Sequence, residues 1–342
     1  MAYADPVSTT SPLLHKLLDN VKYYYYDVWN IYGDPRVSNY PFMDGGPWST
    51  IALICGYLAL VKSIGPNFMK DRKPYDMRNI ILLYNVALVT INGWLFYSGS
   101  WITNFGLDSW KCQPVDRRSR DPLDLYKIQL GWYFYVTKTI DFCDTFFFVL
   151  RKKNRQISGL HVFHHSCMPL FCWIGLKFTP GGNNAFFPWL NSGVHTVMYA
   201  YYALSTFPHL APYLWWKKYI TSMQMIQFVA VIVHSFYSML SPGCAWPKMF
   251  IYLSIFNAFL FFCMFYSFFK RTYSVESSKS SSSSPLTSST SLNSSSSLSC
   301  FSSSTKCTLN NDQLNLAKVN YDSVSRKRIS QRIAQCNDSN IK

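Results

Sequence analysis

The chain has 342 residues, of which 49% are hydrophobic, 18% aromatic and only 14% charged, and its formal net charge is +15. Soluble domains carry about 25% charged residues, so this composition excludes an ordinary soluble domain and indicates an integral membrane protein. The positive charge does not indicate a nucleic-acid partner, because ten of the 32 Lys and Arg residues follow residue 269. The others lie mostly in short loops between apolar segments, where membrane orientation explains them.

The first 45 residues form an N-terminal segment that precedes the first apolar stretch. They contain the run VKYYYYDVW but no basic segment followed by a long apolar core, so we expect no cleavable signal peptide. Tyr and Trp are enriched at the boundary between membrane and water. The run therefore predicts an interfacial element.

Seven apolar segments follow, each long enough, or nearly so, to cross about 30 Å of hydrocarbon at about 1.5 Å per residue. They predict an all-α fold, a polytopic membrane protein with seven transmembrane helices in a domain of residues 46–272. The segments cover residues 48–64, 79–102, 128–150, 160–178, 185–205, 219–240 and 246–269.

The charged loops orient this bundle. The loops after the first, third and fifth segments, together with the residues after the seventh, hold most of the Lys and Arg residues outside the tail. Positive loops stay on the cytosolic side of a membrane. We therefore expect a lumenal N-terminus and a cytosolic C-terminus.

This orientation places two cysteines, Cys112 and Cys244, in lumenal loops. An oxidising lumen would let them form a disulfide, and two free thiols are the alternative. The ten cysteines of the chain contain no CxxC pair.

Residues 273–342 differ in composition from everything before them. Serine dominates the run SSKSSSSSPLTSSTSLNSSSSLSCFSSS, which begins at Ser277. Such a segment buries too little apolar surface to fold. We predict a disordered cytosolic tail.

Ionisable and amide side chains recur within four consecutive apolar segments, where they are costly unless they face a bundle interior. The third segment contains KTIDFCDT, the fourth HVFHH, the fifth NSGVHTVMYAYY and the sixth TSMQMIQF. His161, His164 and His165 share one helix face. At about 1.5 Å per residue, these groups all fall in the cytosolic half of the bundle. We expect a shared cavity there, although Lys138 and Asp141 could also form a purely structural ion pair.

Clustered imidazoles raise the alternative of a metal site, because neutral histidine binds zinc and iron. Di-iron membrane enzymes use repeated histidine boxes with about eight ligands, whereas this chain has seven histidines in all. We therefore expect no metal and no cofactor. A single zinc ion is the alternative that this count leaves open.

The four motifs together resemble those of the very-long-chain fatty acid elongases, membrane-bound condensing enzymes of the endoplasmic reticulum. The likeness covers roughly residues 35–270. The KxxExxDT box appears with Asp141 in place of Glu, and the HxxHH, NxxxHxxMYxYY and TxxQxxQF boxes are complete. The resemblance implies that long-chain acyl-CoA and malonyl-CoA condense to 3-oxoacyl-CoA, CoA and CO2 in that membrane.

The resemblance also implies roles for individual residues. His164 would be the nucleophile and His195 an acid, base or orienting partner. The other expected catalytic residues are His161, His165, Asp144 and Asn191. The expected substrate-binding residues are Lys138, Asp141, Tyr199, Tyr202, Gln224, Gln227, Arg151, Lys152, Lys153, Arg155, Lys217 and Lys218. The last six suit the phosphates of CoA, and the positive-inside rule alone would also explain them.

Several partners follow from the same resemblance. They are membrane lipid, the 3-oxoacyl-CoA reductase, 3-hydroxyacyl-CoA dehydratase and enoyl-CoA reductase of the elongation cycle, and a homo- or hetero-oligomer. A metal-dependent desaturase or hydroxylase and a seven-helix receptor or transporter are the competing interpretations. Neither would require all four boxes.

Overall fold

The computed structural model describes the backbone of residues 12–281 and the side chains of residues 13–273. Within that range every regular element is a helix, as the sequence predicts, and no strand occurs. The last helix continues to Ser281, and residues 282–342 of the predicted tail lie outside the described residues.

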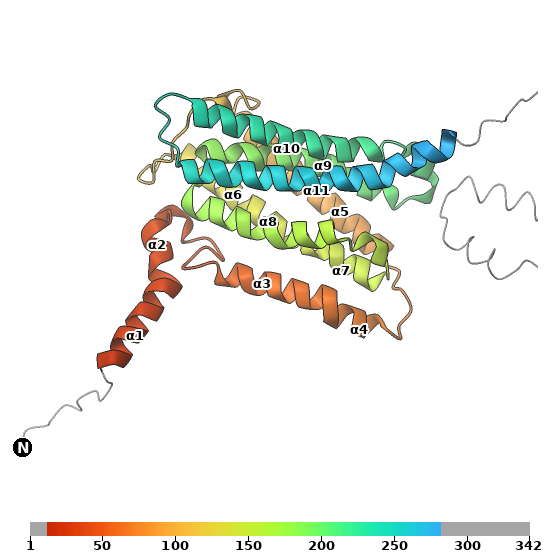
Figure 1. The fold of residues 1–342 in the computed structure, drawn as a ribbon, viewed down its shortest axis with the longest axis horizontal. Helices are drawn as coiled ribbons and strands as arrows, with labels where there is room; N and C mark the ends of the chain where they lie inside the picture. Colours follow the sequence, from red (N-terminus) through yellow and green to blue (C-terminus); the bar gives the residue numbers. More distant parts are fainter. Residues whose placement is uncertain (1–11, 282–342) are drawn as a thin grey trace, which may run out of the picture. The chain divides into compact units, whose positions relative to one another are not determined.

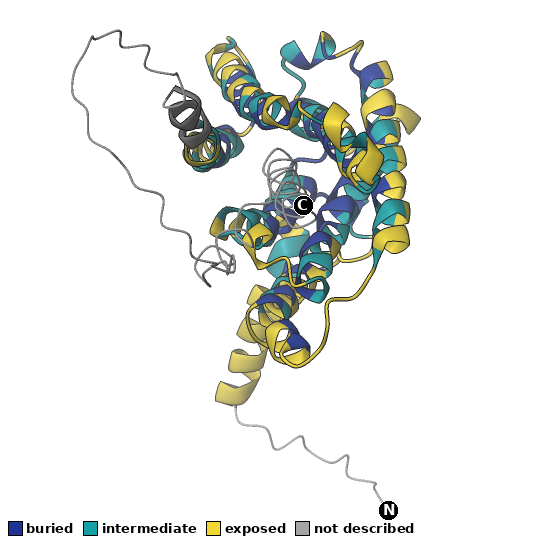
Figure 2. Cartoon of the chain, turned by 90° about the vertical axis from the view of Figure 1, so that its right-hand side faces the viewer, coloured by how far each residue is buried: buried dark blue, intermediate teal, exposed yellow. Residues whose placement is uncertain are grey.

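The N-terminal part forms short helices. They are α1 (Pro12–Lys22), a π-helical turn (Tyr23–Asp27) and α2 (Val28–Tyr32). The apolar residues of α1 are exposed, and Figure 2 shows this helix almost entirely in the colour of exposed residues.

Helices occupy all seven predicted segments. They are α3 (Trp48–Ala59), which continues through a π-helical turn (Leu60–Ile64) into α4 (Gly65–Met69), α5 (Arg78–Ile102), α6 (Pro122–Ile140), α7 (Phe142–Leu150), α8 (Gly159–Phe178), α9 (Phe186–Ser205), α10 (Lys217–Leu240) and α11 (Lys248–Ser281).

Four of these helices are long and apolar enough to cross a membrane. They comprise Trp48–Met69, Arg78–Ile102, Lys217–Leu240 and Lys248–Tyr273. The helices at the remaining three predicted segments do not meet the same criterion of length and apolar composition. Most of the polar motifs of the sequence lie on these three helices. The structure is therefore that of an all-helical, polytopic membrane protein.

The helices from α3 to α11 run alongside one another (Figure 1). Close neighbours are α5 with α9, α10 with α11, and α6 with α8. The loop between α2 and α3 is anchored to α8, because the Trp173 indole donates to the carbonyl of Phe42 at 2.9 Å and Lys177 Nζ donates to that of Met43 at 2.8 Å. This loop thereby ties the N-terminal part to the bundle.

The structure decides between the two alternatives that the sequence left open for Cys112 and Cys244. Cys112 and Cys244 form a disulfide with a Cα–Cα distance of 5.6 Å. It joins the loop after α5 to the loop between α10 and α11, so the free-thiol alternative is wrong.

Candidate active site

A buried lysine lies at the centre of the polar groups that the sequence singles out. Lys138 Nζ, near the end of α6, lies 3.2 Å from Asp141 Oδ2 and 3.2 Å from His195 Nδ1 on α9. The relative exposure of the three residues is 2%, 1% and 5%. The structure therefore joins the third and fifth segments through an ion pair and a histidine shielded from solvent.

Asp141 lies at a one-residue break between two helices. The sequence pattern predicts one helix over residues 128–150, but α6 ends at Ile140 and α7 begins at Phe142. Asp141 lies at the break, with φ −58° and ψ −14°. Its carboxylate contacts both Lys138 and the hydroxyl of Tyr199.

Tyr199 connects two carboxylates. Its hydroxyl lies 2.9 Å from Asp141 Oδ1 and 2.8 Å from Asp144 Oδ2. A phenol has one proton and donates to one acceptor at a time. Tyr199 on α9 thus lies between the carboxyl groups of Asp141 and Asp144 and ties both to its own helix.

The three histidines of α8 form a second cluster. Ser158 caps this helix, since its Oγ accepts a hydrogen bond from the backbone N–H of His161 at 3.2 Å. The cap places His161 in the first turn. The His165 ring then lies 4.2 Å from the His161 ring and 5.2 Å from the His164 ring, measured between centroids.

Two residues that the sequence did not mark as site residues hold His161. Its Nε2 lies 2.7 Å from Thr145 Oγ1, which in turn lies 3.0 Å from the Tyr57 hydroxyl on α3. Thr145 belongs to the KTIDFCDT motif and could have been selected on that ground. Tyr57 could not have been identified as a site residue from the sequence, because nothing in its own segment indicates which helix it faces.

His164 points toward α11. Its ring lies 5.0 Å from that of Phe261 and 6.2 Å from that of Phe265. His164 is partly buried, whereas His165 is buried. Among the described residues no hydrogen bond joins His164 to His195, so these two imidazoles approach the site from different helices without direct contact.

The amides of α9 and α10 meet beside the histidines. Asn191 Nδ2 donates to Gln227 Oε1 at 3.3 Å, and Gln224 Nε2 lies 3.4 Å from Met198 Sδ. Asn191 Oδ1 is buried and has no hydrogen-bond partner among the described residues. A buried acceptor of this kind is available to a ligand or a water molecule. Tyr202 is 37% exposed, so it lies at the edge of the cluster.

The predicted basic residues lie at one end of the bundle, where α7 ends and α8 and α10 begin (Figure 1). Arg151 is partly buried and the other five, Lys152, Lys153, Arg155, Lys217 and Lys218, are exposed. Lys152 Nζ donates to the carbonyl of Lys70, and Lys218 lies over the ring of Tyr219. The HVFHH motif starts at the same end, a few residues into α8.

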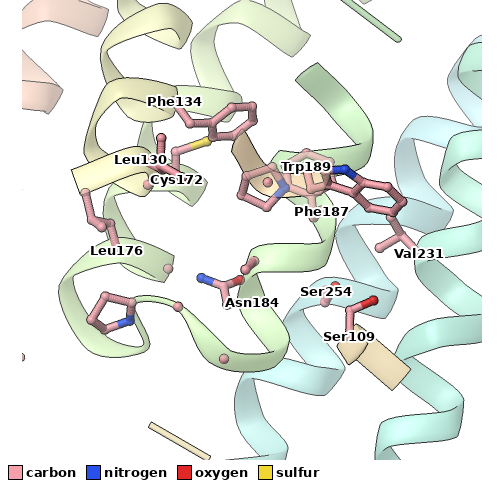
Figure 3. A pocket seen from close by; sticks show the side chains of 18 of the residues that line it. Ser109, Leu130, Phe134, Cys172, Leu176, Asn184, Phe187, Trp189, Val231 and Ser254 are labelled. Atoms are coloured by element: carbon pink, nitrogen blue, oxygen red, sulfur yellow. The ribbon is translucent and has the colours of Figure 1, made fainter. Parts of the chain in front are cut away.

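An apolar cavity of about 400 Å³ lies among the helices, and its lining on α8 begins at Met168, after the last histidine of HVFHH (Figure 3). Residues of α5, α6, α8, α9, α10 and α11 line it. Met168 lies one helical turn after His164, and Phe261 contacts the His164 ring. None of the four clustered histidines is among the residues that line the cavity. The cavity lined by imidazoles that the sequence predicts therefore differs from the arrangement observed.

Among residues 12–281, no group of three or more His, Cys, Asp and Glu side chains is arranged to hold a metal ion. His161 Nε2 contacts Thr145 and His195 Nδ1 contacts Lys138. These nitrogens are therefore engaged with protein groups and do not converge on one point.

The sequence is similar to known proteins over most of its described length. The profile of the ELO: GNS1/SUR4 family matches residues 42–281. A very long chain fatty acid elongase of Aedes aegypti is 43% identical over 79% of this chain and 74% of its own length. Very long chain fatty acid elongase 7 of Drosophila melanogaster is 43% identical over 75% of this chain and 79% of its own length.

A human relative shows the same similarity. Very long chain fatty acid elongase 1 of Homo sapiens is 39% identical over 71% of this chain and 87% of its own length. The family match covers both the helices that carry the polar clusters and the helices that line the cavity. This chain belongs to the ELO family.

Proposed function

We propose that this protein is the condensing enzyme of fatty acid elongation, a very-long-chain 3-oxoacyl-CoA synthase. A long-chain acyl-CoA and malonyl-CoA would give a 3-oxoacyl-CoA two carbons longer, together with CoA and CO2. The observation that carries the proposal is the position of HVFHH between a basic end of the bundle and an apolar cavity. The names of the relatives support the same reaction.

The proposed topology has seven spans in the membrane of the endoplasmic reticulum, with the N-terminus lumenal and the C-terminus cytosolic. Three helices, α6–α7, α8 and α9, would be spans whose polar residues face the bundle interior. The loops that carry Arg151, Lys152 and Lys217 would then face the cytosol, in agreement with the positive-inside rule.

The first half-reaction would use His164. A neutral imidazole nitrogen attacks the thioester carbon, the C–S bond breaks, and CoA leaves as a thiol that takes the imidazole proton. The product is an acyl-imidazole. The alkyl chain would extend past Met168 and Phe261 into the apolar cavity, where its burial is favourable.

In the second half-reaction malonyl-CoA loses CO2, and its α-carbon attacks the acyl carbon. The C–N bond to His164 breaks, and the imidazole takes up one proton from water. Negative charge develops on the thioester oxygen of the enolate and on the acyl oxygen. Fixed N–H donors stabilise such charge most when water is excluded.

His195 supplies such a donor. The ammonium of Lys138, held by Asp141, has three N–H donors and no acceptor. His195 Nδ1 must therefore accept from Lys138, which leaves the imidazole proton on Nε2. We accordingly assign His195 as a neutral Nε2–H donor rather than a general base, with Lys138 as its positioning residue.

The remaining residues would bind and orient the substrates. Arg151, Lys152, Lys153, Arg155, Lys217 and Lys218 suit the phosphates of CoA. Asn191, Gln224 and Gln227 would contact the thioesters, with no cofactor beyond these substrates. The enzymes of the elongation cycle and an oligomeric assembly are further proposed partners.

The test is condensation by membranes that contain the protein. A panel of long-chain acyl-CoA substrates with labelled malonyl-CoA should give labelled 3-oxoacyl-CoA two carbons longer. The variant His164→Ala should lose the product entirely, because no nucleophile remains. His209→Ala, in an exposed loop, is the matched control and should keep wild-type turnover. Absence of product across the whole panel would refute the proposed function.

A further inference from the structure

The end of the cavity farthest from the histidines is lined by residues of connecting segments as well as by residues of the long helices. Along α8 alone the cavity extends from Met168 beyond Leu176, about 12 Å at 1.5 Å per residue. At its far end lie two connecting segments. The residues that line the cavity there are Asp108, Ser109, Lys111 and Gln113 of the loop after α5, and Pro180, Gly181 and Gly182 of the turn between α8 and α9.

The loop after α5 is fastened at several points. Cys112 lies between two lining residues and is bonded to Cys244. The carbonyl of Ser109 lies 2.8 Å from His234 Nε2 on α10, and the backbone N–H of Gln113 donates to Asn183 Oδ1 at 2.9 Å. The loop is therefore held by α10, by the 3-10 helical turn (Gly182–Ala185) that precedes α9 and by the segment that precedes α11.

These segments approach each other closely. Gly182 has φ +52°, and a Cβ added there would lie 2.3 Å from the carbonyl oxygen of Gln113 and 2.8 Å from the Trp246 ring. Trp246 follows Cys244 in the same short loop. The disulfide thus holds the two loops against the turn at a point where no side chain fits between them.

The character of the wall changes at the same place. Leu95, Leu130 and Phe134 form an apolar wall, whereas polar residues line the far end, and the Asp108–Lys111 ion pair among them is exposed to solvent, with a contact of 2.6 Å. Each methylene group that is buried in apolar surroundings raises the binding affinity by a factor of about four, and a methylene group that is not buried does not contribute this factor. An acyl chain that reaches this end therefore gains nothing from further carbons.

We propose that the loop of residues 103–113 is the stop for the methyl end of the acyl chain. By holding this loop, the Cys112–Cys244 disulfide determines the longest chain that the enzyme condenses. This inference rests on the proposed function and deepens it, because it assigns the determinant of chain length. Without the disulfide the loop can move outward, and the cavity lengthens.

The first experiment compares the chain-length profile of the wild type with that of the double variant Cys112→Ser, Cys244→Ser. Saturated acyl-CoA substrates of increasing length compete for labelled malonyl-CoA, and kcat/KM is measured for each length. We expect the double variant to extend the profile by at least one two-carbon step, with kcat/KM on the longest substrate rising about fifteenfold relative to the shortest, since each of the two added methylenes contributes a factor of about four. Cys263→Ser, an exposed thiol on α11, should leave the profile unchanged.

A second variant keeps the disulfide and fills the cavity end. Gln113→Phe should shorten the profile by a similar step, because the larger side chain occupies space next to the stop. This variant keeps the proposal testable if the double variant does not fold. An unchanged profile in Gln113→Phe, or in a folded and active double variant, overturns the proposal.

A third measurement does not require turnover. Wild-type protein is photolysed with the longest accepted acyl-CoA carrying a diazirine at its methyl end, and the labelled residues are identified by mass spectrometry. Labels within residues 103–113 support the stop, and labels elsewhere overturn it. Labelling of this loop without condensation of any substrate would instead refute the proposed reaction and leave the chain-binding role standing.

Discussion

At the scale of single residues, the shortened carboxylate of the third segment is explained by its partners. Asp141 stands where the family box has Glu, and its carboxylate still reaches Lys138 at 3.2 Å and Tyr199 at 2.9 Å. Asp141 lies at the break between α6 and α7. The pair also fixes the orientation of His195, which the sequence left open between acid, base and orienting roles.

The donor role of His195 can be separated from a base role by two amide variants. His195→Gln places an N–H close to the position of Nε2, whereas His195→Asn places it closer to Nδ1. We expect Gln to retain more than about ten times the kcat of Asn, since loss of one such donor costs about 100-fold. The measurement is kcat and KM for both CoA substrates at neutral pH. Equal loss in the two variants would favour a base.

At the scale of helices, the start of α8 determines where its histidines lie. Ser158 accepts the hydrogen bond of the His161 N–H, so the first helical turn is fixed and His161 meets Thr145. Thr145 is also in contact with Tyr57 of α3. Three helices thereby position one imidazole, and the two others follow from the i, i+3, i+4 spacing.

The cap itself is open to test. Ser158→Ala removes the acceptor and should lower the stability of the first turn by about 1 kcal/mol. We expect kcat to fall severalfold with little change in KM, because His161 is less well ordered. Ser158→Asp, which also caps helices, should restore most of the activity. A loss in Ser158→Asp equal to that in Ser158→Ala would show that capping is not the cause.

At the scale of the molecule, the six basic residues proposed to bind CoA and the far end of the apolar cavity lie at opposite ends of one bundle. These basic residues lie at the end where the histidine helix begins, and the disulfide lies at the far end of the cavity. A substrate with a polyanionic head and an alkyl tail matches this division. Burial of the tail and pairing of the phosphates then act on the same molecule.

This division predicts a selective effect of surface charge. Arg155→Ala should raise KM for the CoA substrates severalfold while kcat changes little, because the contact is made equally before and during reaction. The effect should weaken at high ionic strength, where exposed charges are screened. Arg118→Ala, exposed in the loop after α5, is the charge-matched control. An equal rise in KM there would indicate a nonspecific effect of net charge.

The helical segments, the four polar motifs and the family were all readable from the order of residues. Apolar length and i, i+3, i+4 spacing are local properties, which a chain carries before it folds. The one-residue break at Asp141 and the contact of its carboxylate with Tyr199 were not readable in this way, because that contact joins two helices.

The contacts that give these motifs their roles depended on the packing of helices. Tyr57 and Thr145 are 88 residues apart, and Cys112 and Cys244 are 132 apart. Spacing within a helix defines a face but not the neighbour that the face meets. Only the folded arrangement therefore decided which nitrogen of His195 meets Lys138, that the two cysteines pair, and where the apolar cavity ends.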